Sequence, residues 1–249
     1  MKLKNKVALI TGSSRGIGRA TAISMAKEGA NIIINYLNSK NEAESLKNLL
    51  IEKYGIKAIT INADIKNEEE VKSMIEKSIA VFGHIDILVN NAAIAKDSLL
   101  FDKTKEHFLE VLSTNLIGPF LVSKYVSQHM LKQKYGKIIN VSSTNAINTY
   151  YPESADYDAS KAGLISLTHN LAKELSPIIN VNAVAPGWTN TDMNKELTKE
   201  QIEKEKKNIL LKRFADPMEI ANVITFLATN DANYINDTII KVDGGYDNE

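Results

Sequence analysis

Two side chains near the middle of the chain, Tyr157 and Lys161, could together transfer a proton. Residues four apart on a helix share one face, so a phenol and an ammonium at this spacing can lie side by side. Free tyrosine has a pKa of about 10, and a nearby positive charge favours the phenolate. The pair suggests a tyrosine that donates a proton near neutral pH, although the two residue types also meet at this spacing by chance.

A glycine-rich turn near the N-terminus, Thr11–Gly18, is the second feature that could do chemistry. The apolar run Val7–Ile10 precedes it and suits a buried parallel strand, while a helical pattern follows from Arg19. Glycines let the backbone approach a pyrophosphate, and a helix N-terminus presents free N–H groups and a positive dipole end. The three clustered glycines favour a dinucleotide site over a turn that needs glycine for geometry alone.

With these motifs in order, the chain resembles a short-chain dehydrogenase/reductase over essentially its whole length. The glycine motif of that family falls on Gly12, Gly16 and Gly18. Its Asn-Asn-Ala-Gly motif appears as Asn90–Ala93, with alanine in place of the last glycine, and its Pro-Gly turn is Pro186–Gly187. The resemblance implies that the catalytic residues are Asn115, Ser143, Tyr157 and Lys161.

The sequence pattern predicts an α/β fold. Continuous apolar strands that alternate with helices indicate a Rossmann-type, doubly wound parallel sheet of about seven strands with helices on both faces. No linker divides the chain, so we expect a single domain, residues 1–249. The expected strands are Val7–Ile10, Asn31–Asn35, Lys57–Ile61, Ile85–Val89, Lys137–Val141, Ile179–Val184 and Thr238–Val242.

Helices are expected at Asn41–Tyr54, Glu68–Phe82 and Lys105–Leu131. The highly charged stretch Lys195–Lys207 interrupts the alternation. It is either a solvated helix or a mobile lid over the substrate, and the resemblance favours a lid at about residues 192–213. Asp237 stands where relatives have glycine, and we expect an altered turn there because Asp tolerates left-handed backbone angles.

Composition excludes several classes of protein. The chain has no cysteine, which excludes disulfides, thiolate metal sites and cysteine nucleophiles, and no metal site is expected. The formal net charge is zero, so nothing suggests a nucleic-acid or membrane partner. The apolar run after the basic N-terminus is too short for a signal-peptide core or a membrane span, and we expect a cytoplasmic protein.

The expected cofactor is NADP(H). An acid at the end of the second strand selects NAD, but Tyr36–Lys40 contains none, and the guanidinium of Arg15 can reach the same place and match a phosphate. Asp64 resembles an adenine contact, or instead caps the next helix. The full set of expected cofactor contacts is Gly12, Ser14, Arg15, Gly16, Ile17, Gly18, Tyr36, Ser39, Asp64, Ile65, Asn91, Ala92, Tyr157, Lys161, Pro186, Gly187, Thr189 and Thr191.

The resemblance also implies a role for each catalytic residue. Carbonyl reduction needs a hydride on carbon and a proton on oxygen. Tyr157 would give the proton, and Lys161 would lower its pKa and hold the nicotinamide ribose. Ser143 would stabilise the developing charge on the substrate oxygen. Asn115 would lie in a helix kink, near Pro119, and hold a water that links Lys161 to solvent.

The position of the catalytic serine depends on the alignment of one loop. Most relatives carry serine thirteen residues before the tyrosine, where this chain has Thr144. The strand before Ser143 aligns without a gap, so we place one extra residue in the loop at 145–156 and choose Ser143, with Thr144 as the alternative. Tyr150 and Tyr151 in this loop either line the substrate pocket or pack on the surface.

Among its relatives the chain looks most like the β-ketoacyl carrier-protein reductases, on the stretch Asn91–Leu100. Lys134 matches one basic position for the acidic carrier protein, but Ser176–Ile179 lacks the second. A small-molecule ketone or sugar dehydrogenase is therefore an alternative, and a non-catalytic dinucleotide-binding sensor is a third. The resemblance also implies a homotetramer that forms through Lys105–Leu131 and Asp156–Leu175.

Overall fold

The computed structural model describes residues 1–195 and 197–246, so residue 196 of the predicted lid and residues 247–249 of the predicted domain lie outside the described residues. Seven parallel strands form one sheet in the order β3-β2-β1-β4-β5-β6-β7, which confirms the predicted fold class. The strands are β1 (Val7–Ile10), β2 (Asn31–Tyr36), β3 (Ala58–Asn62), β4 (Ile87–Asn90), β5 (Gly136–Val141), β6 (Ile179–Pro186) and β7 (Ile239–Val242).

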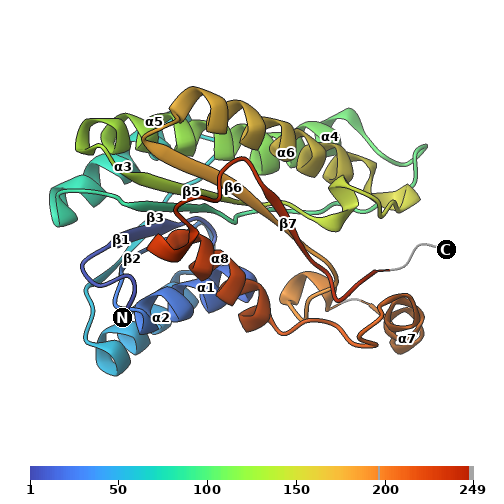
Figure 1. Ribbon diagram of the computed structural model, residues 1–249. Helices are drawn as coiled ribbons and strands as arrows, with labels where there is room; N and C mark the ends of the chain where they lie inside the picture. Colours follow the sequence, from blue (N-terminus) through green and yellow to red (C-terminus); the bar gives the residue numbers. More distant parts are fainter. Residues whose placement is uncertain (196, 247–249) are drawn as a thin grey trace.

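Helices cover both faces of this sheet (Figure 1). Alternate residues of β1 enter different apolar clusters, since Ala8 and Ile10 pack on one side and Val7 and Leu9 on the other. Strand order reverses between β1 and β4, which places a crevice at their carboxyl ends. One face carries α3 (Glu68–Phe82), α4 (Lys105–Leu112), α5 (Gly118–Gln133) and α6 (Ala155–Leu175); the other carries α1 (Gly16–Lys27), α2 (Lys40–Tyr54) and α8 (Pro217–Ala228), while α7 (Lys199–Asn208) lies at the side.

Local chemistry sets the ends of the helices. The side chain of Asn67 accepts hydrogen bonds from the backbone N–H groups of Glu69 and Glu70 and so begins α3. Asp64 therefore does not cap this helix. Gly55 and Gly83 end α2 and α3 in the left-handed region, with φ of 64° and 81°. Asp237, before β7, also has a positive φ, 60°, which is the left-handed conformation that Asp tolerates.

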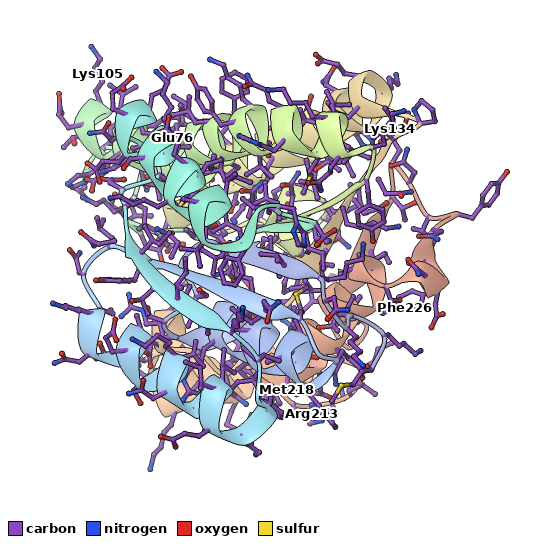
Figure 2. All side chains as sticks on the ribbon, turned by 90° about the vertical axis from the view of Figure 1, so that its left-hand side faces the viewer. Glu76, Lys105, Lys134, Arg213, Met218 and Phe226 are labelled. Carbon is purple, nitrogen blue, oxygen red and sulfur yellow. The ribbon has the colours of Figure 1, made fainter. Side chains whose placement is uncertain are left out.

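The helical stretch predicted at Lys105–Leu131 is present, as two α-helices with a different helical turn between them. A π-helical turn at Ser113–Ile117 separates α4 from α5, and such turns widen a helix by one residue. Pro119 lies in the first turn of α5, where its missing N–H is tolerated. The π turn contains Asn115, the residue that the resemblance places at a helix kink. Figure 2 shows Lys105 and Lys134 at opposite ends of this helical layer.

Two kinds of feature are absent from the described residues. None of their helices is both long and apolar enough to cross a membrane. Nor do they include a group of three or more His, Cys, Asp or Glu side chains that could hold a metal ion.

Candidate active site

The turn between β1 and α1 packs too closely for side chains at two of its glycines. A Cβ on Gly12, where φ is 61°, would lie 2.9 Å from the Cα of Ala92. A Cβ on Gly18 would lie 2.5 Å from the Nδ2 atom of Asn91. That Nδ2 donates to the carbonyls of Thr11 at 2.9 Å and of Gly12 at 3.1 Å. The end of β4 is thereby locked to the glycine turn.

Asn35, which the sequence analysis did not single out, organises the same turn from β2. Its side chain is buried, with 2% of the residue exposed. Its Oδ1 accepts from the Gly12 N–H at 3.2 Å, and its carbonyl accepts from the Ser13 N–H at 3.0 Å. Its Nδ2 donates to the Ala63 carbonyl at 3.0 Å. An amide that directly follows the apolar run Ile32–Ile34 was the available signal.

The start of α1 is suited to an anion. The helix begins at Gly16, its first turn has no acidic residue, and the side chain of Arg15 makes no capping hydrogen bond. Thr191 faces this turn from beyond β6, since a Cβ on Gly16 would lie 3.5 Å from its methyl carbon. Free N–H groups and the positive dipole end at this place fit a pyrophosphate.

Residues predicted to meet the adenosine lie around the ends of β2 and β3. Tyr36 is buried at the end of β2, and Ser39 precedes α2 without a side-chain capping bond. The carboxylate of Asp64 accepts from the backbone N–H of Lys66 at 3.0 Å. Ile65 is buried against Gly118, so its side chain points into the fold rather than toward a ligand.

Tyr157 and Lys161 lie together on α6. The Nζ of Lys161 is 5.7 Å from the centre of the tyrosine ring and donates to the Val141 carbonyl at 2.7 Å. Burial lowers the pKa of Lys161 to about 7 and raises the pKa of Tyr157 to about 12, with the Ser143 hydroxyl opposing the second effect. The expected lowering of the Tyr157 pKa is not found, because desolvation outweighs its neighbours. The phenol therefore keeps its proton at neutral pH and can donate it.

A hydrogen bond from the Ser143 hydroxyl to the Tyr157 phenol lowers the pKa of the phenol, against the larger effect of burial. The Ser143 hydroxyl accepts from the Asn145 N–H at 3.2 Å and donates to the Asn145 Oδ1 at 3.3 Å. The Nδ2 of Asn145 in turn donates to Asp158 at 2.8 Å. Thr144 is buried and begins a short 3-10 turn.

Asn115 is fully buried in the π turn and joins two segments. Its Oδ1 accepts from the Ile94 N–H and its Nδ2 donates to the Ile94 carbonyl, both at 2.9 Å. The Nδ2 also donates to the Ser160 hydroxyl at 3.1 Å. Both amide hydrogens are engaged, so the side chain has no N–H left for the water expected from the resemblance.

A buried ion pair that the sequence analysis missed supports the start of α6. The Nζ of Lys103 lies 2.7 Å from the Oδ1 of Asp156, and these side chains are 6% and 0% exposed. The same Oδ1 accepts from the Tyr157 N–H at 2.9 Å. The pair therefore fixes the backbone of Tyr157 to the segment that follows β4.

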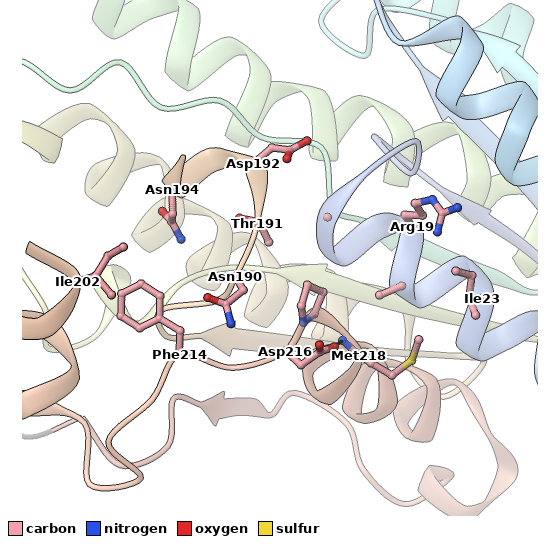
Figure 3. Close-up of a pocket in the computed structure, with 13 residues that line it drawn as sticks. Arg19, Ile23, Asn190, Thr191, Asp192, Asn194, Ile202, Phe214, Asp216 and Met218 are labelled. Atoms are coloured by element: carbon pink, nitrogen blue, oxygen red, sulfur yellow. Dashed lines mark hydrogen bonds between the residues drawn. The ribbon is translucent and has the colours of Figure 1, made fainter. Parts of the chain in front are cut away.

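The segment after β6 borders the site from the other side. A Cβ on Gly187, next to Pro186, would lie 2.8 Å from the Cβ of Asp243. The Thr189 hydroxyl donates back to the Gly187 carbonyl at 3.0 Å. A cavity of about 520 Å³ opens between this segment and α1 (Figure 3). Gly16 and Thr191 both line it, so it is continuous with the glycine turn.

Comparison with known proteins gives full-length similarities. Residues 12–247 match the family described as Enoyl-(Acyl carrier protein) reductase. The chain is 43% identical over 243 residues to 3-oxoacyl-(acyl-carrier-protein) reductase FabG of Staphylococcus epidermidis, covering 97% of this chain and 98% of the relative. It is 42% identical over 246 residues to the protein of that name in Aquifex aeolicus, covering 98% of both.

A solved structure has the same fold. It is a short chain dehydrogenase from Burkholderia cenocepacia J2315 in complex with NADP, 32% identical to this chain with a TM-score of 0.92. The match covers 98% of this chain and 99% of that one.

Proposed function

Because the chain belongs to the short-chain dehydrogenase/reductase family, we propose that it reduces the ketone of a β-ketoacyl group on acyl carrier protein with NADPH. The protein is an NADP(H)-dependent oxidoreductase, as the sequence predicted. One observation supports the proposal: the Ser143 hydroxyl lies against the Tyr157 phenol, and the Nζ of Lys161 is 5.7 Å from the centre of the same ring. A sensor without catalysis would not need this arrangement.

NADPH supplies the hydride when it is bound. The protonated Tyr157 donates its proton to the substrate oxygen, which is general acid catalysis. The Ser143 hydroxyl donates a hydrogen bond to the same oxygen and stabilises the negative charge that develops there. Lys161 has a pKa of about 7, so it exchanges a proton readily near neutral pH. When Tyr157 has given up its proton, the charged lysine beside it would balance the negative charge of the phenolate.

The cofactor contacts follow from the fit of the glycine turn. A side chain at Gly12 or Gly18 would meet Ala92 or Asn91, so these glycines keep the turn close to the end of β4, and the N-terminus of α1 would hold the pyrophosphate. Asn91 and Ala92 border the cradle from β4. The exposed guanidinium of Arg15 and the absence of an acid at Tyr36–Ser39 favour the 2′-phosphate of NADP.

A second candidate, a free small-molecule ketone, is favoured by the place of Lys134. This residue ends α5, just before the amino end of β5, whereas Ser143 follows the carboxyl end of β5. Lys134 therefore lies at the edge of the sheet opposite the site within one chain (Figure 2). The sequence analysis had expected it near the mouth of the cleft.

The test is NADPH oxidation with acetoacetyl-carrier protein and with free ethyl acetoacetate, side by side. We expect a higher kcat/KM for the carrier-linked substrate, and Tyr157→Phe, which removes only the hydroxyl, should lower turnover by about 10²–10⁴-fold. A preference for the free ester would favour the second candidate. Tyr157→Phe activity equal to wild type would exclude the proposed mechanism.

The same assay tests the cofactor. Arg15→Ala should weaken the binding of NADPH about tenfold to a hundredfold, because a hydrogen bond to a charged group contributes roughly 1.5–3 kcal/mol. The binding of NADH should change little. Equal losses for both nucleotides would contradict a role for Arg15 at the 2′-phosphate.

The proposal extends to a homotetramer built on the helices of one face. Leu164 and Leu171 of α6, which were expected at the interface, are instead buried in this chain. Exposed apolar side chains remain at Leu109, Ile117 and Phe120, on α4, the π turn and α5. Such a surface suits association between copies. Light scattering that gives a monomer mass at micromolar concentration would contradict it.

A further inference from the structure

A buried carboxyl group lies on the most polar helix of the protein. The sequence of α7 is Lys-Glu-Gln-Ile-Glu-Lys-Glu-Lys-Lys-Asn, and Glu205 is its one buried residue, 8% exposed. A carboxyl group is expensive to bury unless hydrogen bonds replace its water. Glu205 therefore needs hydrogen-bond partners, and α7 itself offers it no other buried residue.

Three aromatic side chains from distant segments supply these partners. The Oε2 of Glu205 accepts from the Tyr246 hydroxyl at 2.6 Å, the Tyr151 hydroxyl at 2.8 Å and the Trp188 Nε1 at 3.0 Å. The two tyrosine oxygens are 3.1 Å apart, and Trp188 stacks on Phe214 with ring centres 5.4 Å apart. One oxygen of α7 thus joins three separate parts of the chain.

Two of the donors come from the segments that flank the reacting groups. Trp188 directly follows Gly187 in the turn after β6. Tyr151 begins the segment that leads into α6, and its carbonyl accepts from the Ser154 hydroxyl at 3.1 Å. Ser154 also donates to Asp158 at 2.8 Å, next to Tyr157. The contacts of Glu205 are therefore connected through a few hydrogen bonds to the backbone that carries the proton donor.

We propose that Glu205 is a positioning residue for the substrate, which holds α7 against Tyr151 and Trp188 and so fixes the two segments that flank the reacting groups. The inference rests on the proposed carbonyl reduction, because it concerns the same site. Glu205 touches no reacting atom. Its contribution is to keep two aromatic side chains in place, so its loss affects the binding of the ketone substrate more than the chemical step.

Trp188 is the single tryptophan of the chain, so its fluorescence reports on this network directly. Glu205→Ala should shift the emission of Trp188 to longer wavelength, because α7 no longer shields the indole. KM for the keto substrate should rise about tenfold or more with kcat little changed, as expected for lost hydrogen bonds to a carboxyl group. Glu205→Gln keeps an acceptor oxygen and should lie between Glu205→Ala and wild type.

The matched control is Glu203→Ala, on the same helix. Glu203 is exposed and pairs only with Lys206 among the described residues, so emission and KM should stay at the wild-type values. Tyr246→Phe removes one donor and leaves the carboxyl group, and it should move both readouts in the direction of Glu205→Ala. This milder variant carries the test if Glu205→Ala does not fold.

Wild-type emission and KM in Glu205→Ala would overturn the proposal, as would a fall in kcat with unchanged KM. The emission measurement needs no turnover. If the wild-type protein reduces no ketone, the proposed function fails, while the emission of the variants still shows whether Glu205 holds α7 against Trp188.

Discussion

Replacing Lys161 by methionine should abolish turnover and yet stabilise the protein at mildly acidic pH. Lys161 is 2% exposed and its Nζ donates to the Val141 carbonyl, with no carboxylate within ion-pair distance among the described residues. Burial therefore disfavours the ammonium. Methionine has a similar length without a charge, so the variant removes the free-energy cost of burying that charge.

The size of this effect follows from the pKa. One pKa unit between the folded and unfolded chain corresponds to about 1.4 kcal/mol, so lowering from 10.5 to about 7 costs on the order of 5 kcal/mol for the charged form. Below pH 7 the lysine is charged in both states, and the full cost is present. Between about pH 7 and 10.5 only the unfolded chain binds the proton, so the stability of the wild type rises with pH. Loss of the bond to Val141 offsets about 1 kcal/mol of the gain.

Urea unfolding at pH 6 and pH 9 measures the difference. Lys161→Met should be more stable than wild type by roughly 2–4 kcal/mol at pH 6, and this advantage should shrink by about 2–3 kcal/mol at pH 9. Lys173→Met, an exposed lysine on the same helix, is the control and should show no such dependence on pH. The reasoning is refuted if Lys161→Met is less stable than wild type at both pH values, or if its advantage does not change with pH.

Three further predictions follow from the site. Ser143→Ala should lower turnover about 10²–10³-fold while Thr144→Val stays within about tenfold of wild type, and the reverse pattern would move the catalytic hydroxyl to Thr144. Gly18→Ala should weaken NADPH binding at least about tenfold in a fluorescence titration, because the new methyl displaces Asn91 from the turn; unchanged affinity would contradict the close packing. Lys103→Met should lower the free energy of unfolding by about 3–5 kcal/mol, because it leaves the Asp156 carboxylate buried without a partner, and a loss below about 1 kcal/mol would show that the pair contributes little.

The sheet could be predicted from the sequence because its signals are local. Most strands contain a run of apolar residues, as suits a strand covered on both faces, and the observed ends differ from the predicted ones by two residues or fewer. The glycine turn and the pair Tyr157–Lys161 could also be predicted, because each depends only on the spacing of residues within one short segment. The π turn inside the helical stretch predicted at Lys105–Leu131 was not part of that prediction, because a π turn leaves no mark in the apolar pattern.

Tertiary structure decided what depends on segments far apart in the chain. Asn35 and the pair Lys103–Asp156 acquire their roles only when β3 and the start of α6 lie beside them. In the sequence, Glu205 is one of many charged residues on a helix that looks solvent-exposed. Only the tertiary structure brings three aromatic donors from other segments to its carboxylate. The pKa of Tyr157 was expected to be lowered and is instead raised. Desolvation depends on all the groups packed around the phenol, and it outweighs the neighbours that lower the pKa.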